Sequence, residues 1–153
     1  MATLIRLAAD GTLLLIAGVG GVLLLMKVRQ QFWATAPVVV MAGLTSLLVG
    51  KLMSLIYQPE VVRPFEKLGI EPGAAYINNP GFPSDHVLLA TVIVCAVYAV
   101  GGVAYRRVAY LLASLVVIMG LARVAAHVHT PLDVVFGGIA GLSGTLWYKK
   151  LTK

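Results

Sequence analysis

The sequence predicts an all-α fold, a polytopic bundle of about five transmembrane helices with its polar residues gathered at one membrane face. Of the 153 residues, 59% are hydrophobic and only 12% are charged, whereas a soluble domain usually carries about 25% charged residues. A bilayer core needs about 20 apolar residues per helix, and candidate spans occur near 8–26, 36–57, 87–104, 107–125 and 132–148. No repeat or low-complexity tail interrupts the chain, so we expect residues 1–153 to form one membrane-embedded domain.

The first apolar run is followed by Lys27 and Arg29, not by a small-residue cleavage site, so we expect a retained span and not a signal peptide. Connections near 27–35 and 105–106 are short, whereas about 58–86 form a polar segment rich in Pro, Gly and Asn. A loop of this length in so small a protein needs a reason. Small residues in the last span favour close helix packing: Gly137, Gly141 and Gly144.

Charge is distributed unequally between the two faces that five spans define. Side A carries the N-terminus, the long loop and the connection between the fourth and fifth spans, and side B is the opposite face. All six acidic residues fall on side A, whereas side B holds seven of the twelve basic residues: Lys27, Arg29, Arg106, Arg107, Lys149, Lys150 and Lys153. The positive-inside rule makes side B cytoplasmic and side A extracytoplasmic, for which a bacterial plasma membrane is the natural setting. Because the basic residues form no polar stripe, we expect no nucleic-acid partner.

Two basic residues in apolar surroundings need an explanation. Lys51 lies within the second span, where an ammonium group costs about 2.5–3.5 kcal/mol. Arg123 ends the fourth span. Either side chain alone could extend to the interface, but both converge on side A, where an anionic ligand would pair with them.

All three histidines, His86, His127 and His129, lie on side A at span ends. A zinc site would need further ligands, but the single cysteine, Cys95, lies in an apolar run and is interpreted as packing. We therefore expect no metal. The alternative is acid–base and nucleophilic chemistry by imidazole, for which a second group must orient the ring.

The segment Pro83-Ser84-Asp85-His86 precedes the third span. Pro, Ser and Asp are common at helix starts, so capping alone would explain three of the four residues. Backbone N–H groups at a helix N-terminus also bind anions, and Ser84 could add a hydroxyl donor. His86 is the residue that capping leaves unexplained.

The segment Thr130-Pro131-Leu132-Asp133 fits a helix start, with Thr130 as the N-cap and Asp133 as the acid that reaches back. Asp133 also follows His129 by four residues. Its carboxylate could therefore orient one ring nitrogen and leave the other exposed as a nucleophile. The two roles are compatible.

Together these residues resemble the type-2 phosphatidic acid phosphatase family of the acid phosphatase and vanadium haloperoxidase superfamily. That family has three motifs in chain order: Lys followed by Arg-Pro, then Pro-Ser-Gly-His, then Ser-Arg followed by a spaced His and Asp. Here they correspond to Lys51 with Arg63-Pro64, to Pro83-Ser84-Asp85-His86, and to Ala122-Arg123 with His129 and Asp133. The resemblance covers most of residues 51–133.

Four departures affect what the resemblance implies. Eleven residues separate Lys51 from Arg63, more than the family's usual gap, so Lys51 is the weakest correspondence. Ala122 replaces the usual Ser. Asp85 replaces Gly, as it does in undecaprenyl-diphosphatases of the family, and favours a polyprenyl substrate. The family usually has six spans, and the first is the one missing here, which would place the N-terminus outside.

The resemblance implies a mechanism without a cofactor or metal. His129 would attack phosphorus and form a phosphohistidine, Asp133 would orient its ring, and His86 would protonate the leaving oxygen. The expected phosphate-binding residues are Lys51, Arg63, Ser84, Asp85 and Arg123. His127 lies outside the motifs, and a structural role is expected for it.

The expected partners are a lipid phosphate substrate and the bilayer, and undecaprenyl diphosphate is the favoured substrate. Phosphatidylglycerophosphate or phosphatidic acid is the alternative within the same chemistry. A different class, a small transporter or an anion-binding membrane subunit, would also use charged residues within spans. The clustering of polar residues at one face, away from the bilayer midplane, disfavours that class.

Overall fold

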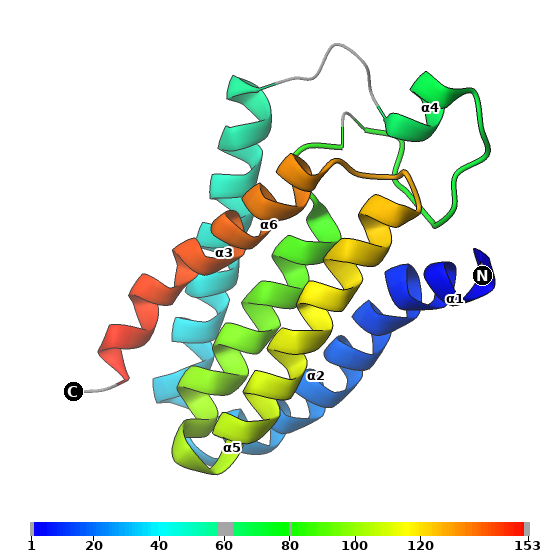
Figure 1. Cartoon of the computed structure of the whole chain (residues 1–153). Helices are drawn as coiled ribbons and strands as arrows, with labels where there is room; N and C mark the ends of the chain where they lie inside the picture. Colours follow the sequence, from blue (N-terminus) through cyan, green and yellow to red (C-terminus); the bar gives the residue numbers. More distant parts are fainter. Residues whose placement is uncertain (1, 58–62, 80, 152–153) are drawn as a thin grey trace.

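Long apolar helices form the body of the molecule (Figure 1). The computed structural model describes residues 2–57, 63–79 and 81–151, and this part of the chain contains helices but no strand. Helix α1 (Ala2–Arg6), the π-helical turn η1 (Leu7–Gly11) and α2 (Thr12–Gln30) follow one another directly. The remaining elements are α3 (Phe32–Ile56), the short α4 (Pro64–Leu68), α5 (Asp85–Ala125), α6 (Pro131–Ser143) and the 3-10 helix η2 (Gly144–Lys150).

Three helical stretches of the described chain are long and apolar enough to cross a membrane: Ala2–Gln30, Phe32–Ile56 and Asp85–Ala125. The third consists of two arms that fold back on each other, which Figure 1 shows in green and yellow. The three stretches thus supply four of the five expected spans. The fifth, predicted near 132–148, corresponds to α6 and η2. The prediction of an all-α transmembrane bundle is confirmed.

The turn between the two arms of α5 lies at Gly102, and the predicted connection near 105–106 was wrong by a few residues. Gly102 has φ 57° and ψ −146°, a conformation open only to a residue without Cβ. Arg106 and Arg107, at the predicted connection, lie in helical backbone of the second arm.

Helix α5 is the centre of the bundle and packs against α2 on one side and α6 on the other. The predicted close packing of the last span is confirmed. A Cβ on Gly141 would lie 2.8 Å from the carbonyl oxygen of Leu88, and one on Gly144 would lie 2.7 Å from Ser46 Oγ. Large apolar side chains cover the outside of the bundle, as expected where it meets lipid.

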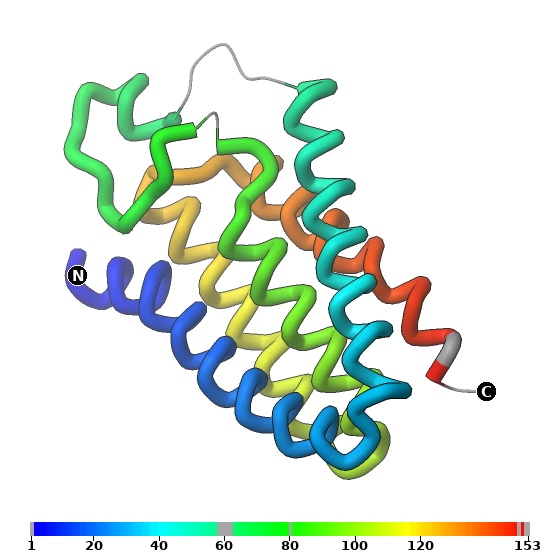
Figure 2. Tube along the Cα trace, turned by 180° about the vertical axis from the view of Figure 1, so that it is seen from behind, coloured from blue at the N-terminus to red at the C-terminus, as the bar shows by residue number. Residues whose placement is uncertain are grey.

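One end of the bundle, termed the loop end, holds the N-terminus, α4 and the segments that flank α5 and α6 (Figures 1 and 2). The Gly102 turn and the connection between α2 and α3 lie at the opposite end. The loop end corresponds to side A of the sequence prediction. Glu60 and Lys153, which the prediction placed on sides A and B, lie outside the described residues.

Candidate active site

The candidate residues gather at the loop end because the starts and ends of several helices meet there. Ser84 precedes α5, Arg123 lies in the last turn of its second arm, and His129 is in the connection to α6. Arg63 precedes α4, and Asp133 is in the first turn of α6. A backbone hydrogen bond from Ser84 N to Asp133 O, at 2.9 Å, joins the start of α5 to the start of α6.

Arg63 is buried and is held by backbone carbonyls. Its Nη1 donates to Val128 O at 2.6 Å, and its Nη2 donates to Ile77 O at 2.9 Å and to Asn79 Oδ1 at 2.8 Å. Its Nε has no hydrogen-bond partner among the described residues. Burial lowers the pKa of Arg63, and the carboxylate of Asp133 opposes that shift most strongly. An anion that accepted from Nε would offset part of this desolvation.

Gly81 makes room for the Arg63 guanidinium. Its φ is 84°, and a Cβ added there would lie 3.0 Å from Arg63 Cζ and 3.1 Å from Nε. Gly81 therefore packs against the side of the guanidinium that carries the unpaired Nε. The long loop is thus organised around Arg63, which gives a reason for its length.

Arg123 is 1% exposed and does not extend to the interface. Its Nη1 pairs with Asp10 Oδ1 at 3.1 Å, and its Nη2 donates to Ala75 O at 2.8 Å. Asp10 Oδ2 in turn accepts from Ala75 N at 3.0 Å. Arg123 Nε is buried without a partner in the described chain.

Sequence reasoning missed Asp10 as the partner of Arg123. Asp10 lies in the π-helical turn η1, a feature that often marks functional positions in helices. The available signal was an acidic residue at the edge of the first apolar run, which needs a partner of opposite charge. Asn79 was missed as well, and its side chain links Arg63 to Asp85.

His129 and Asp133 approach each other as their spacing predicts. His129 Nδ1 lies 3.6 Å from Asp133 Oδ2, slightly beyond hydrogen-bond length, and no other described residue bonds to Nδ1. The same carboxylate oxygen accepts from Thr130 N at 2.7 Å, and Asp133 N donates to Thr130 Oγ1 at 3.2 Å. The predicted capping box is confirmed, and it fixes the carboxylate beside the His129 ring.

Burial lowers the pKa of His129 below its ordinary value of 6.5, and its interaction with Asp133 only partly opposes the shift. The neutral imidazole is therefore favoured at neutral pH. A neutral ring with a carboxylate at Nδ1 presents a lone pair at Nε2, which is what a nucleophile requires.

Ser84 is the N-cap of α5 by position, but its hydroxyl makes no capping hydrogen bond. Its Oγ is fully buried and has no partner among the described residues. His86, in the first turn of α5, is half-buried and lies within electrostatic reach of Arg123 and His129. The start of α5 thus supplies the site with an uncommitted hydroxyl and a second imidazole.

Asp85 and Lys51 lie to one side of this group. Asp85 is exposed, and its Oδ2 accepts from Asn79 Nδ2 at 3.3 Å. Lys51 is exposed on α3 and shares a small cleft of about 80 Å³ with Asp85 and Asn79. It forms no ion pair within the described ranges. Lys51 and Asp85 thus lie at the rim of the site. The structure brings the other six predicted residues together: Arg63, Ser84, His86, Arg123, His129 and Asp133.

His127 has a backbone role. Its φ is 57°, unusual for a residue with a side chain, and its carbonyl accepts from Phe65 N at 3.0 Å. The side chain is exposed. This turn connects α5 to His129 and docks α4 onto the site.

Unpaired buried polar atoms concentrate at the loop end. Within residues 2–57, 63–79 and 81–151, five buried side-chain polar atoms have no hydrogen-bond partner, and four belong to the candidate site: Arg63 Nε, Ser84 Oγ, Arg123 Nε and His129 Nδ1. Each buried polar group without a partner lowers the free energy of unfolding by about 1–3 kcal/mol. Three of the four can donate to an oxyanion. No three His, Cys, Asp or Glu side chains of the described ranges are grouped as a metal site requires.

Comparison with known families supports the same chemistry. The model of the PAP2 superfamily matches residues 30–153, a region that contains every candidate residue except Asp10. Comparisons with curated proteins and with solved structures gave no match. Membership in that superfamily indicates a phosphatase acting on phosphate esters. The family match and the buried donor cluster lead to one conclusion: the chain belongs to the PAP2 superfamily and is a phosphatase in a membrane.

Proposed function

We propose that this chain is a metal-independent lipid phosphatase that hydrolyses undecaprenyl diphosphate to the monophosphate through a phosphohistidine intermediate. The observation that carries the proposal is the set of buried, unpaired donors on Arg63, Ser84 and Arg123 beside His129. Phosphoryl transfer depends mainly on positioning and on stabilising charge spread over the phosphoryl oxygens. Two fixed guanidinium groups and a hydroxyl supply that stabilisation without reorganising during the reaction.

In the first step His129 Nε2 attacks phosphorus, and the bond from phosphorus to the leaving oxygen breaks. Protonated His86 donates its proton to that oxygen, while Asp133 stabilises the charge that develops on the His129 ring. In the second step a water oxygen attacks phosphorus, the N–P bond breaks, and neutral His86 accepts the water proton. The products are undecaprenyl monophosphate and inorganic phosphate.

A diphosphate suits this site better than a phosphate monoester. It carries more negative charge for the two arginines, and its leaving group is a phosphate, which departs more readily than an alkoxide. Lys51 and Asp85 line one small cleft at the rim, and in this proposal the second phosphate would bind there. With the loop end extracytoplasmic, the site would face the leaflet where a polyprenyl carrier is released during envelope polymer synthesis.

Trapping the intermediate tests the chemistry. Rapid quenching with substrate labelled in the terminal phosphate should give label on His129, stable to base and labile to acid. His129→Ala should abolish turnover and labelling, while His127→Ala, a matched change in the same loop, should retain both. Turnover should survive EDTA. If activity is lost with chelator and restored by a divalent cation, the metal-independent mechanism is wrong.

A comparison of substrates tests specificity separately. We expect kcat/KM for undecaprenyl diphosphate to exceed that for phosphatidylglycerophosphate and for phosphatidic acid in the same detergent, since this ratio measures discrimination between competing substrates. A tenfold preference for either glycerolipid would identify a glycerolipid phosphatase and leave the phosphohistidine mechanism intact.

A further inference from the structure

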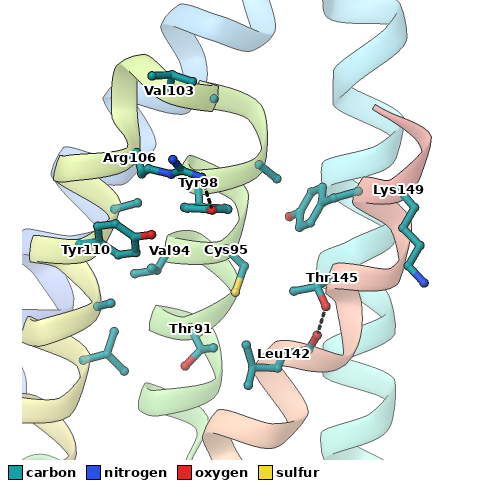
Figure 3. A pocket seen from close by; sticks show the side chains of 16 residues that line it. Thr91, Val94, Cys95, Tyr98, Val103, Arg106, Tyr110, Leu142, Thr145 and Lys149 are labelled. Carbon is teal, nitrogen blue, oxygen red and sulfur yellow. Dashed lines mark hydrogen bonds between the residues drawn. The ribbon is translucent and has the colours of Figure 1, made fainter. Parts of the chain in front are cut away.

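A second concave surface, termed the lateral groove, lies along the first arm of α5, away from the loop end. Its cavity measures about 730 Å³ and is lined by both arms of α5, α6 and η2. Small-molecule sites commonly measure about 300–1,000 Å³. Figure 3 shows the groove between the two α5 arms on one side and η2 on the other, and most of its wall is apolar, including Val94, Cys95 and Leu142.

The groove has the length of one lipid chain. On the first arm its lining residues run from Thr91 to Gly102, which at 1.5 Å per residue corresponds to about 17 Å. One leaflet is half of a hydrocarbon core of about 30 Å, or about 15 Å. The apolar wall therefore extends from near the bilayer midplane to the end of the bundle opposite the loop end.

That end of the groove is cationic. Arg106 Nη2 donates to the Tyr98 hydroxyl at 3.3 Å, and Arg106 Cζ lies 5.8 Å from the Tyr98 ring centroid. Figure 3 shows this contact on the wall formed by the two arms of α5. No carboxylate pairs with Arg106 among the described residues, and the sequence has no acidic residue between Asp85 and Asp133. The protein thus leaves an anion site open at the end of an apolar channel.

Tyr148 adds a second unsatisfied group. It lines the same groove, is 7% exposed, and its buried hydroxyl has no partner in the described chain. It is the one buried unpaired polar atom of the described residues that does not belong to the candidate active site. A buried hydroxyl of this kind would donate to an ester or phosphate oxygen of a bound lipid.

We propose that the lateral groove binds one phospholipid with an anionic head group, its acyl chain along the first arm of α5 and its phosphate at Arg106. The apolar length requires a lipid and not free phosphate, and the acid-free cationic end selects an anionic head group over a zwitterionic one. This site is separate from the proposed catalytic site and does not depend on its substrate.

Photo-crosslinking in proteoliposomes tests the proposal. Phosphatidylglycerol and phosphatidylcholine probes, each with a diazirine in the acyl chain, would be compared at equal dilution in an unlabelled bilayer of neutral lipid. We expect phosphatidylglycerol to label peptides containing Thr91–Ala99 about fivefold more than phosphatidylcholine, the preference that one basic residue gives. Arg106→Gln should remove the preference, whereas Arg107→Gln, adjacent but outside the groove, should preserve it.

A second pair of variants tests the apolar part. Ala113→Phe narrows the groove and should reduce labelling by both probes, whereas Val117→Phe adds the same ring on the lipid-facing surface and should not. Melting temperatures show whether each variant is folded. If Ala113→Phe does not fold, the comparison of Arg106→Gln with Arg107→Gln still tests the proposal. Equal labelling by both lipids, or a groove protected by a second copy of the chain, would overturn the proposal.

Discussion

Asp10 lies on the first span, outside the region that matches the family, yet it contacts the guanidinium of Arg123. Removing one partner of a buried ion pair leaves an uncompensated charge, at a cost of about 3–5 kcal/mol. Asp10 is 26% exposed, so the lower end of that range applies.

We therefore expect Asp10→Ala to lower the free energy of unfolding by about 3 kcal/mol and to raise KM, because Arg123 would no longer be fixed. Asp10→Asn keeps an acceptor oxygen and should recover part of both effects. Thermal unfolding and steady-state kinetics measure them, with Glu71→Ala, an exposed loop acid, as the control. Unchanged kinetics in a destabilised Asp10→Ala would show that Asp10 supports the fold alone.

Gly81 and Gly69 offer a matched pair for testing the space beside Arg63. Both have positive φ, 84° and 63°, but a Cβ at Gly69 meets nothing within 4 Å, whereas one at Gly81 meets the guanidinium. Alanine at either position should cost about 1–2 kcal/mol of backbone strain. Only Gly81→Ala should also reduce kcat/KM, by at least about tenfold if one charge-assisted contact of about 1.4 kcal/mol is lost. Equal activity of the two variants would contradict this account of the loop.

The lowered pKa of His129 predicts the acid side of the pH profile. The proposed mechanism needs a neutral His129 ring as the nucleophile, so on the acid side of the profile kcat/KM should fall only below pH 6.5, as the lowered pKa of His129 is approached. Stability should also decrease as pH falls below 6.5, since the unfolded state binds the proton more readily than the folded state does. His127→Gln should leave the profile unchanged. An acid limb centred above 6.5 would mean that His129 is not the titrating nucleophile.

At the scale of elements, the packing of α6 against the start of α5 positions Asp133. A Cβ on Gly137 would lie 2.6 Å from Ser84 O, whereas one on Gly138 would meet nothing within 4 Å. Gly137→Ala should destabilise the protein by about 1–3 kcal/mol and reduce kcat, because it separates Ser84 from Asp133. Gly138→Ala should be neutral or stabilising, by up to about 1 kcal/mol. Denaturant unfolding and activity on the same samples distinguish the two.

The elements differ in how far sequence alone could predict them. The apolar spans and the Thr130–Asp133 capping box follow from local spacing, and the structure confirms both. The predicted connection near 105–106 missed the turn at Gly102, whose position depends on a backbone conformation that only glycine adopts readily. The Arg123–Asp10 pair joins residues 113 positions apart, and the contact between Arg63 and Asn79 depends on a loop fold. No local sequence pattern predicts either contact.

At the scale of the whole molecule, the placement of charge predicts orientation. In a Cys95→Ser background, a cysteine at Asn78 in the long loop should react with an impermeant reagent on intact cells, because the loop end is expected to be extracytoplasmic. A cysteine at Val103, beside the Gly102 turn, should be protected until the membrane is opened. Asn78 is the better probe position because the neighbouring Asn79 holds Arg63. The opposite labelling pattern would exclude an external substrate pool.

The loop between α4 and α5 also divides the chain into two pieces. A cut at the exposed Ile70–Glu71 step would leave Asp10, Lys51 and Arg63 on one fragment and Ser84, His86, Arg123, His129 and Asp133 on the other. Neither fragment could assemble the site alone. The Arg123–Asp10 pair and the bond from Arg63 to Val128 would cross the cut. If the two halves are co-expressed, activity should appear only where their helices associate in the bilayer. Enzyme turnover would then measure that association directly.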